Sequence, residues 1–481
     1  MATRRRGGAR PRSLAAVVLA AGHGTRLRSA LPKTLHQVCG KPVLWHVLRA
    51  AHGARPDRLL IVVGKGRGQV EEAAEGFGFP EIEFVHQERR LGTGHAVMVA
   101  EEAVGSVDDV LVLPGDEPLV TAKQIRDLVR TLRRGDAAAV VQTAIAADPR
   151  GFGRVIREGD ELLRITEGSE ATAEELAIAE VATAVYAFRR EDLYKALQLT
   201  TRETSQGEYY LHHVLPILRE KGERIVVRLV DNGGSVGANS RSELAQAAVV
   251  MRRRINESHM ARAVTIVDPS STHIDAGVRI EPDAVILPMT FLEGDTRVGR
   301  EARVGPATRL VDTVVGRGAE VQFSVAREAR IGPRVSVGPY AHLRPGAVLK
   351  EGAKAGSFVE IKKSAVGKGA KVPHLAYVGD ATIGDEANIG AGTVTVNYDG
   401  YEKHRTIVGE KARIGSDTML VAPVRVGKEA YTGAGSTITR NVPPGALAVE
   451  RAEQTTVKGY AKRRAARAAA KRRGGRGKRG S

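Results

Sequence analysis

The stretch that decides the fold of the second half of this chain is IDAGVRIEPDAVILPMTFLEGDTRVGREARVG, residues 274–305. An aliphatic residue recurs at every sixth position, from Ile274 to Val304. Neither an α-helix nor an ordinary strand has a six-residue period. A parallel β-helix has one, because each short strand turns one aliphatic side chain inward and then bends at a small residue. The spacing therefore predicts a parallel β-helix.

The same period continues toward the C-terminus with two changes of phase. Leu310 extends the first series, and the later series are Ile331, Val337, Leu343, Leu349, then Val408, Ile414, Leu420, Val426, Thr432 and Ile438. The phase changes at 310–321 and 393–406 predict loops that interrupt the repeats. We expect the β-helix domain to span residues 262–458.

The first half of the chain, residues 14–241, alternates apolar strands with helical stretches. The predicted strands are Ala15–Leu19, Leu59–Val63, Ile82–Val85, Val110–Leu113, Ala138–Thr143 and Ile225–Leu229. The predicted helices include Pro42–Ala51, His95–Val104 and Ala122–Arg133. This alternation is typical of a doubly wound, mostly parallel α/β sheet, which binds ligands beyond the carboxyl ends of its strands. We therefore expect a site in the loops that follow Leu19 and Leu113.

Apolar residues at helical spacing predict a linker helix over 242–261. The two termini are basic: residues 1–13 carry five arginines, residues 461–481 carry ten lysines and arginines, and neither segment has an acid. Fifteen of the eighteen net positive charges thus lie in the tails. The nearly neutral body argues against a basic nucleic-acid platform. We expect disordered tails at 1–13 and 459–481, without functional nucleic-acid binding.

Composition excludes further classes of protein. The single cysteine, Cys39, excludes intrachain disulfides and a cysteine-based zinc cluster. The longest apolar run, Leu14–Ala21, is much shorter than the ~20 residues that span a bilayer. With the arginines before it, this run has features of a signal peptide. The glycine-rich loop that follows favours a buried first strand instead, and we expect a cytoplasmic protein.

That glycine-rich loop is the strongest local motif, LAAGHGTRL at residues 19–27, followed by Pro32-Lys33. Small residues let backbone N–H groups approach a phosphate closely. Arg26 and Lys33 are candidate catalytic residues, because cations there would neutralise charge on the same phosphates. Asp116 lies at a predicted strand end, where an oxygen ligand could meet both a metal ion and a phosphate.

The motif resembles the sugar-nucleotidyltransferase signature. Together with the repeats, residues 14–458 resemble the bacterial family of bifunctional N-acetylglucosamine-1-phosphate uridyltransferase/glucosamine-1-phosphate acetyltransferases. Further segments that carry the resemblance are Leu91–Ala96, Gly151–Arg154, Gln206–Tyr210, His342–Gly346, Phe358–Lys363, His374–Asp380, Asn388–Thr393 and Asn397–Gly400. The resemblance implies a left-handed β-helix and a homotrimer with acetyltransferase sites between subunits. It also implies acetylation of glucosamine 1-phosphate by acetyl-CoA, then transfer of UMP from UTP, giving UDP-N-acetylglucosamine and pyrophosphate.

The resemblance assigns site residues to both halves. For the uridyl site it implies Leu19, Ala20, Ala21, Gly22, Lys33, Gln87, Gly92, Thr93, Gly115, Gly153, Glu167 and Asn239, with Asp116 and Asn239 binding Mg²⁺. For the phosphosugar of the acetyl site it implies Arg344, Lys362, Tyr377, Asn388 and Lys403, and for acetyl-CoA it implies Ala391, Asn397, Tyr398, Ser416, Ala434 and Arg451. His374 would be the catalytic base with Glu360 nearby, since an imidazole with an ordinary pKa of about 6.5 suits deprotonation of an ammonium.

The sugar pocket departs from the family pattern at two positions. Ala182 replaces an asparagine that contacts the sugar, and His212-His213 replaces Thr-Asp. A second interpretation is therefore an acetyltransferase whose uridyltransferase site is weakened or has changed specificity. A third is a regulatory protein, since similar domain pairs occur in nucleotide-exchange complexes of translation initiation. Retention of Lys33, Asp116 and His374 argues against that third class.

Overall fold

The computed structural model describes residues 12–22, 25–64, 67–146, 149–150, 152–166, 171–201, 207–230 and 237–476. The chain divides into two compact units, Met1–Val298 with Arg309–Asp312, and Gly299–Thr308 with Thr313–Ser481. The division falls inside the repeats and not at the predicted linker helix. The reason is that the first repeats are bonded to the N-terminal domain: Ala276 N donates to Cys39 O at 3.0 Å, and Asn256 Nδ2 donates to the carbonyl of Thr272 at 3.2 Å.

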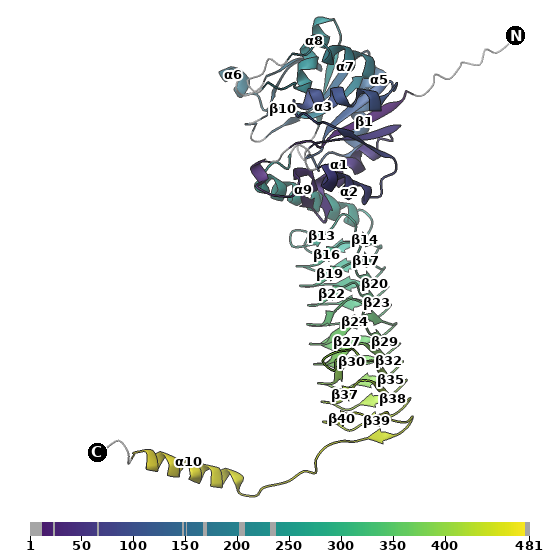
Figure 1. Cartoon of the computed structure of the whole chain (residues 1–481), viewed down its shortest axis with the longest axis vertical. Coiled ribbons are helices and arrows are strands. Elements are labelled where there is room, and N and C mark those ends of the chain that lie inside the picture. Colours follow the sequence, from purple (N-terminus) through teal and green to yellow (C-terminus); the bar gives the residue numbers. More distant parts are fainter. Residues whose placement is uncertain are drawn as a thin grey trace, which may run out of the picture. The chain divides into compact units, whose positions relative to one another are not determined.

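The N-terminal unit is built on a nine-stranded sheet with the order β5-β4-β1-β6-β10-β7-β11-β9-β8. Figure 1 labels β1 and β10 of this sheet. Six strands confirm the sequence predictions to within two residues: β1 (Leu14–Leu19), β4 (Arg58–Val63), β5 (Ile82–His86), β6 (Asp109–Pro114), β7 (Ala139–Ile145) and β11 (Ile225–Val230). The others are β8 (Arg154–Glu158), β9 (Glu161–Thr166) and β10 (Glu180–Arg189). β1 is parallel to both β4 and β6, so the carboxyl ends of these strands meet at one edge.

Helices cover both faces of this sheet. They are α1 (Val43–His52), α2 (Arg67–Glu75), α3 (Thr93–Val99), α4 (Glu101–Val104), α5 (Ala122–Arg134), α6 (Ala173–Leu176), α7 (Arg190–Leu197) and α8 (Val214–Glu220). Alternate residues of β1 face opposite cores: Val17 packs in the cluster that includes α3 and α7, and Val18 packs in the cluster that includes α1 and α5. The predicted helix His95–Val104 is in fact two helices, because Ala100 N bonds to Val97 O, three residues back.

From β12 (Thr265–Ile266) to β41 (Leu447–Ala448), short strands form three parallel sheets of eleven, ten and nine strands. Each strand pairs with one on the next turn of the chain, as β13 (His273–Ile274) pairs with β16 (Phe291–Glu293). The aliphatic residues of the repeat point inward: Ile274, Ile286 and Leu292 are at most 1% exposed. The predicted fold class, a doubly wound domain followed by a parallel β-helix, is therefore confirmed.

The two predicted loops have different outcomes. At 310–321 the prediction is wrong, because β19 (Arg309–Val311), β20 (Val314–Val315) and β21 (Glu320–Val321) follow without interruption. The turn between β19 and β20 is one residue shorter than in the regular repeat, and Asp312 in this turn has a φ of 47°. The second phase change contains a true loop, residues 397–405, between β34 (Val394–Val396) and β35 (Thr406–Val408).

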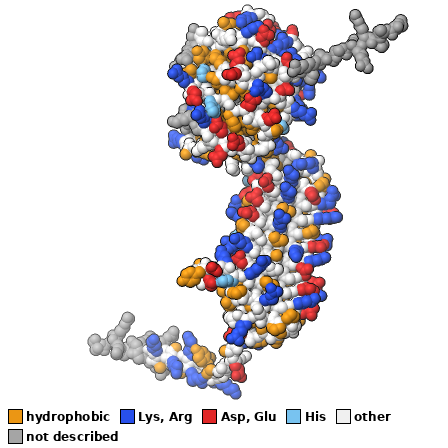
Figure 2. All heavy atoms as spheres, turned by 45° about the vertical axis from the view of Figure 1, so that its right-hand side comes forward, with side chains coloured by type: hydrophobic (Ala, Val, Ile, Leu, Met, Phe, Trp, Pro, Cys, Tyr) orange, Lys and Arg blue, Asp and Glu red, His pale blue; other side chains and the backbone are white. Residues whose placement is uncertain are grey.

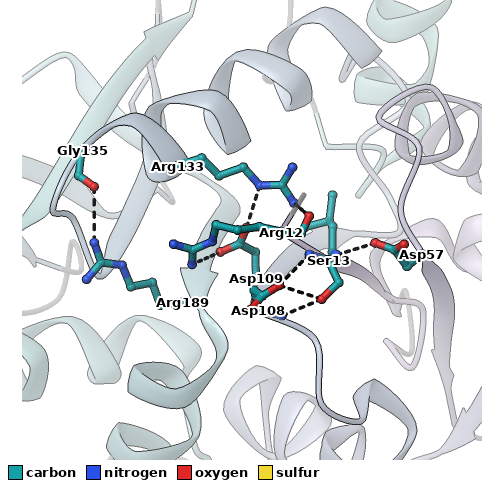
Figure 3. Close-up of polar contacts among 9 residues, drawn as sticks. Arg12, Ser13, Asp57, Asp108, Asp109, Arg133, Gly135 and Arg189 are labelled. Carbon is teal, nitrogen blue, oxygen red and sulfur yellow. Dashed lines mark hydrogen bonds and ion pairs between the residues drawn. The ribbon is translucent and has the colours of Figure 1, made fainter. Parts of the chain in front are cut away.

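Both predicted tails are partly ordered. Arg12 donates to the buried carboxylate of Asp109 at 2.5 Å, and Ser13 donates to Asp108 through its backbone N at 2.7 Å (Figure 3). At the other end, α10 (Tyr460–Arg476) corrects the prediction of disorder. Its sequence is mostly alanine, arginine and lysine, which are strong helix formers. The linker helix α9 spans Arg241–Met260 and begins one residue before its predicted start, with a capping box formed by Ser240 and Glu243.

Figure 2 shows basic and acidic side chains intermingled over the visible face of the two units, with basic side chains along α10. This distribution agrees with a nearly neutral body. Within the described ranges, no helix combines the length and the apolar character needed to cross a membrane.

Removal of residues 459–481 should lower the net charge by ten and leave unchanged the two activities that the resemblance implies. Residues 460–471 of α10 are exposed, and the side-chain hydrogen bond that Arg464 donates to Tyr460 lies within the helix itself. The truncated and complete proteins would be compared by circular dichroism and by separate assays of each activity. Unfolding, or loss of either activity, would show that α10 contributes to the body of the protein.

Candidate functional site

A cavity of about 800 Å³ opens at the carboxyl ends of β1 and β6, where the sequence predicted a site. Among the residues that line it are nine from the predicted uridyl and metal sites: Leu19, Ala21, Gly22, Lys33, Gln87, Gly92, Thr93, Asp116 and Gly153. The predicted residues Ala20, Gly115, Arg26 and Asn239 are not among the lining residues, and Glu167 lies outside the described residues. Arg26 is exposed on the short helix η1 (Thr25–Leu27).

Three polar side chains meet on one side of this cavity. The Lys33 ammonium pairs with the Asp116 carboxylate and donates to Asn239 Oδ1 at 2.5 Å. The backbone holds Asp116 close to Asn239, because Ala238 N, of the residue before Asn239, donates to Asp116 O at 2.8 Å. A carboxylate oxygen and an amide oxygen thus converge on the position of one cation.

The same position suits a divalent metal ion. Glu117 lies next to Asp116 in the chain. Its burial, and secondly the negative charge of Asp116, raise the pKa of Glu117 well above its ordinary range. One buried Glu117 oxygen has no hydrogen-bond partner among the described residues. No set of three or more His, Cys, Asp or Glu in the described ranges could hold a metal. A metal ion between Asp116 and Asn239 would therefore take its other ligands from water or phosphate oxygens, as Mg²⁺ commonly does.

At two glycines near this cavity, backbone segments that are distant in sequence lie very close to one another. Gly115 N donates to Leu19 O at 2.9 Å, and a Cβ on Gly115 would lie 2.8 Å from that oxygen. Gly92 has a φ of 98°, and a Cβ there would lie 2.4 Å from Tyr209 O. Only glycine fits at these two positions. Gln87 Nε2 also donates to Gly92 O at 3.0 Å, which fixes this wall of the cavity.

The opposite wall contains residues that no motif identified. They are Ile165, Ala184 and Tyr186, and beside them lie Phe152 and Tyr210, which belong to motif segments but had no predicted role. Ala182 and His212, the two departures from the family pattern, line the same cavity. The β-branched and aromatic residues Val181, Thr183, Val185, Tyr186 and Phe188 were the available signal for the strand that carries Ala182, Ala184 and Tyr186.

His212 is a neutral side chain at this wall. Its ring stacks on Tyr210 with centroids 5.5 Å apart. Burial, followed by repulsion from His213, lowers the pKa of His212 to about 4. An uncharged imidazole can donate one hydrogen bond and accept another, so it can contact a sugar hydroxyl or amide.

A second cluster of predicted residues lies on the β-helix. Arg344 follows β25 (His342–Leu343), Lys362 ends β28 (Glu360–Lys362), and Tyr377 begins β31 (Tyr377–Gly379), three successive strands of one sheet. A hydrogen bond and charge repulsion from Lys362 lower the pKa of Lys403. A phosphate between these two ammonium groups would relieve that repulsion.

His374 ends β30 (Lys371–His374) in a different sheet and is exposed. Within the described part of the chain its ring makes no hydrogen bond or ion pair, and Glu360 pairs with Arg344 at 2.8 Å. Asn388 lies on the neighbouring strand β33 (Asn388–Ile389), which pairs with β30 through Lys371.

Residues predicted to bind acetyl-CoA lie on successive turns of the chain. Asp417 N, next to Ser416, donates to Ala391 O at 2.6 Å, and Gly435 N, next to Ala434, donates to Ser416 O at 2.8 Å. Arg451 Nη1 donates to Ala434 O at 3.1 Å. Asn397 and Tyr398 begin the loop 397–405, and Asn397 Nδ2 donates to Asp380 at 2.6 Å.

The fold and the cavity define a nucleotidyltransferase domain followed by a hexapeptide-repeat domain. Residues 16–169 match the family model described as a MobA-like NTP transferase domain. Over 447 residues the chain is 46% identical to "Bifunctional protein GlmU" of Desulfitobacterium hafniense, covering 93% of this chain and 98% of that protein. It is also 46% identical to the protein of that name in Streptomyces coelicolor over 466 residues, covering 96% of each.

The chain belongs to the GlmU family of bifunctional proteins. It is a sugar-1-phosphate uridyltransferase and an amino-sugar acetyltransferase of UDP-N-acetylglucosamine biosynthesis. This result confirms the first interpretation of the sequence and excludes the regulatory class.

Proposed function

We propose that uridyl transfer takes place in the cavity at the ends of β1 and β6, and that the convergence of Lys33, Asp116 and Asn239 there is the feature that supports uridyl transfer at this site. A phosphate oxygen of N-acetylglucosamine 1-phosphate attacks the α-phosphorus of UTP. The bond to the bridging oxygen breaks, and pyrophosphate leaves with the electron pair. This reaction needs alignment and charge neutralisation more than a side-chain base.

Each wall then has a part in this reaction. Lys33, with Arg26 of the short helix η1, neutralises phosphate charge. Gln87, Gly92 and Thr93 hold the nucleotide, whereas the wall that carries Gly153 receives the sugar. Asp116 and Asn239 would hold Mg²⁺, which when bound supplies additional positive charge to the phosphates. The backbone of residues 19–22 and 115 allows the phosphates to approach closely.

We propose that acetyl transfer takes place on the β-helix. Arg344, Lys362 and Lys403 bind the phosphate of glucosamine 1-phosphate, with Tyr377 and Asn388 contacting the sugar. His374 takes a proton from the ammonium group, and the free amine attacks the thioester carbon of acetyl-CoA. The C–S bond breaks and coenzyme A leaves as the thiol after protonation. Acetyl-CoA lies along Ala391, Ser416, Ala434 and Arg451, with Asn397 and Tyr398 beside it.

Separate assays of the two half-reactions test this assignment. Release of pyrophosphate from UTP and N-acetylglucosamine 1-phosphate reports the first site. Release of coenzyme A thiol from acetyl-CoA and glucosamine 1-phosphate reports the second. We place both reactions in the cytoplasm, where UTP and acetyl-CoA are made. Failure of either half-reaction with purified enzyme and Mg²⁺ would contradict the corresponding assignment.

The protein is proposed to act as a homotrimer through its β-helix. An exposed apolar row supports this: Phe323, Tyr340, Phe358 and Leu375 are 38–63% exposed. The rings of Tyr340 and Phe358 stack with centroids 5.2 Å apart. Leu375 is the neighbour of His374, so a subunit packed on this row would reach the acetyl site.

Phe358→Asp should therefore dissociate the trimer and lower acetyl transfer, because it places a charge in an apolar interface. Light scattering coupled to gel filtration measures the mass of the assembly. Phe291→Asp, an exposed aromatic on β16, is the matched control and should leave the mass unchanged. A wild-type protein that is monomeric would contradict the proposal outright.

Ala182→Asn should lower the KM for N-acetylglucosamine 1-phosphate about fivefold, because one recovered hydrogen bond is worth ~1 kcal/mol. The KM for UTP should change little. If His212 already makes the contact, Ala182→Asn will have no effect or will clash, and His212→Ala will raise the sugar KM instead. Steady-state kinetics of both variants separates these cases. A sugar KM that neither substitution changes would show that neither side chain contacts the sugar.

A further inference from the structure

The helix α5 carries a row of arginines that lines a second cavity. This cavity has a volume of about 430 Å³ and is lined by Ala54, Arg126, Val129, Arg130, Arg133 and Arg134. Residues 126, 130 and 133 share one helix face because they are four and seven positions apart. The other side of α5 packs Ile125, Leu128 and Leu132 into the core. Of the described residues, none lines both this cavity and the uridyl site.

Three of these arginines are held in place by the surrounding structure. Arg126 Nη1 donates to Gly53 O at 2.8 Å, and Arg130 Nη1 donates to Asp127 at 2.8 Å. Arg133 donates through Nε to Asp109 at 2.7 Å and through Nη2 to Arg12 O at 2.7 Å (Figure 3). A guanidinium has five N–H donors, so each of the three keeps unused donors. Oriented side chains lose less entropy when they bind a ligand.

Positive charge is in excess around this cavity. The buried Asp109 pairs with both Arg12 and Arg133, and Asp127 pairs with Arg130. Arg126 bonds to a neutral carbonyl, and Arg134 makes no hydrogen bond or ion pair within the described part of the chain. Five guanidinium groups, the four that line the cavity and that of Arg12, are thus accompanied by two paired carboxylates, Asp109 and Asp127.

Helix stability explains only part of this arrangement. Cations in the last turn of a helix interact favourably with its dipole, which accounts for Arg133 and Arg134. Arg130 and Arg126 lie about one and two turns earlier, respectively, where that effect has faded. Their clustering on the face that borders a cavity is better explained by a ligand.

We propose that this cavity binds a small anion with several phosphate groups, either a free oligophosphate or a nucleoside polyphosphate. Guanidinium groups match phosphate oxygens in a bidentate, charge-assisted geometry. Ala54, which is partly exposed, offers a small apolar contact next to the phosphates. This anion site is separate from both proposed reaction sites and does not depend on them.

Titration calorimetry with inorganic tripolyphosphate, on the full chain at low salt, tests the proposal. Arg130→Ala/Arg134→Ala removes two lining charges that hold no backbone group. Arg228→Ala/Lys221→Ala is the matched control, since it removes two exposed charges elsewhere in the same domain. Binding in the uridyl cavity is common to all three proteins, so the difference between the double variants reports the arginine-lined cavity.

Binding to this cavity should weaken by about tenfold or more in Arg130→Ala/Arg134→Ala and stay unchanged in the control. Equal tripolyphosphate binding by the two double variants would overturn the proposal. Should the double variant not fold, Arg134→Ala alone serves, with about threefold weaker binding expected and no change as the contrary result. A parallel titration with ATP distinguishes a free oligophosphate from a nucleoside polyphosphate as the ligand. If ATP and tripolyphosphate bind with equal affinity, the cavity recognises the phosphates alone. If ATP binds more tightly than tripolyphosphate, the cavity recognises a nucleotide.

Discussion

His374→Ala should abolish acetyl transfer to glucosamine 1-phosphate and leave uridyl transfer unchanged. A positioned general base contributes about 10²–10⁴ to a rate, so release of coenzyme A should fall by that factor. The fold should not change, because the His374 ring is exposed at the end of β30 and makes no bond within the described part of the chain. The uridyl cavity is lined by other residues in the other compact unit.

Two controls make this experiment specific. His273→Ala, on β13, removes another histidine of the repeats and should leave both activities intact. The thermal unfolding and the oligomeric mass of His374→Ala should match those of the wild type. Loss of both activities in a folded protein would contradict the assignment of the two reactions to separate sites.

Asp116→Asn should give the opposite pattern: uridyl transfer falls at least about 100-fold, and acetyl transfer is unchanged. The substitution keeps the size of the side chain but removes the carboxylate that pairs with Lys33 and that would hold the metal ion. The Mg²⁺ concentration needed for half-maximal activity should also rise, since an amide is a weaker ligand than a carboxylate.

Asp160→Asn is the matched control for this variant. Asp160 is an exposed acid of the same domain that pairs with Arg224 and does not line the cavity. It should leave pyrophosphate release and its dependence on Mg²⁺ unchanged. Normal uridyl transfer by Asp116→Asn would show that this carboxylate does not take part in the reaction.

The β-helix was predictable from sequence because its repeat is local. Each inward position, such as Ile280 or Ile286, is fixed by its own turn of the chain, so the six-residue spacing is visible without any knowledge of distant contacts. The loop after β1 was predictable for a similar reason. A run of apolar residues followed by glycines at 22 and 24 specifies a strand and a turn after it within a dozen residues.

The walls of the uridyl cavity depended on the tertiary structure. β10 lies antiparallel between β6 and β7, and this position brings Ala182, Ala184 and Tyr186 into the cavity. An irregularity in its pairing with β7, between Ala182 and Tyr186, is where Ala184 takes a φ of 57°. Sheet order follows from the packing of both faces at once, so no local pattern in β10 reveals its neighbours.

The sequence by itself therefore determined the two fold classes, the motif loops and the inward residues of the repeats, all of which depend on spacing along the chain. Only the tertiary structure decided which distant side chains meet. Lys33 and Asn239 are 206 positions apart and share a hydrogen bond. The arginines of α5 line a cavity together with Ala54, which follows α1. Such contacts arise when whole elements pack to bury their apolar faces, and their partners are set by that packing rather than by neighbours in sequence.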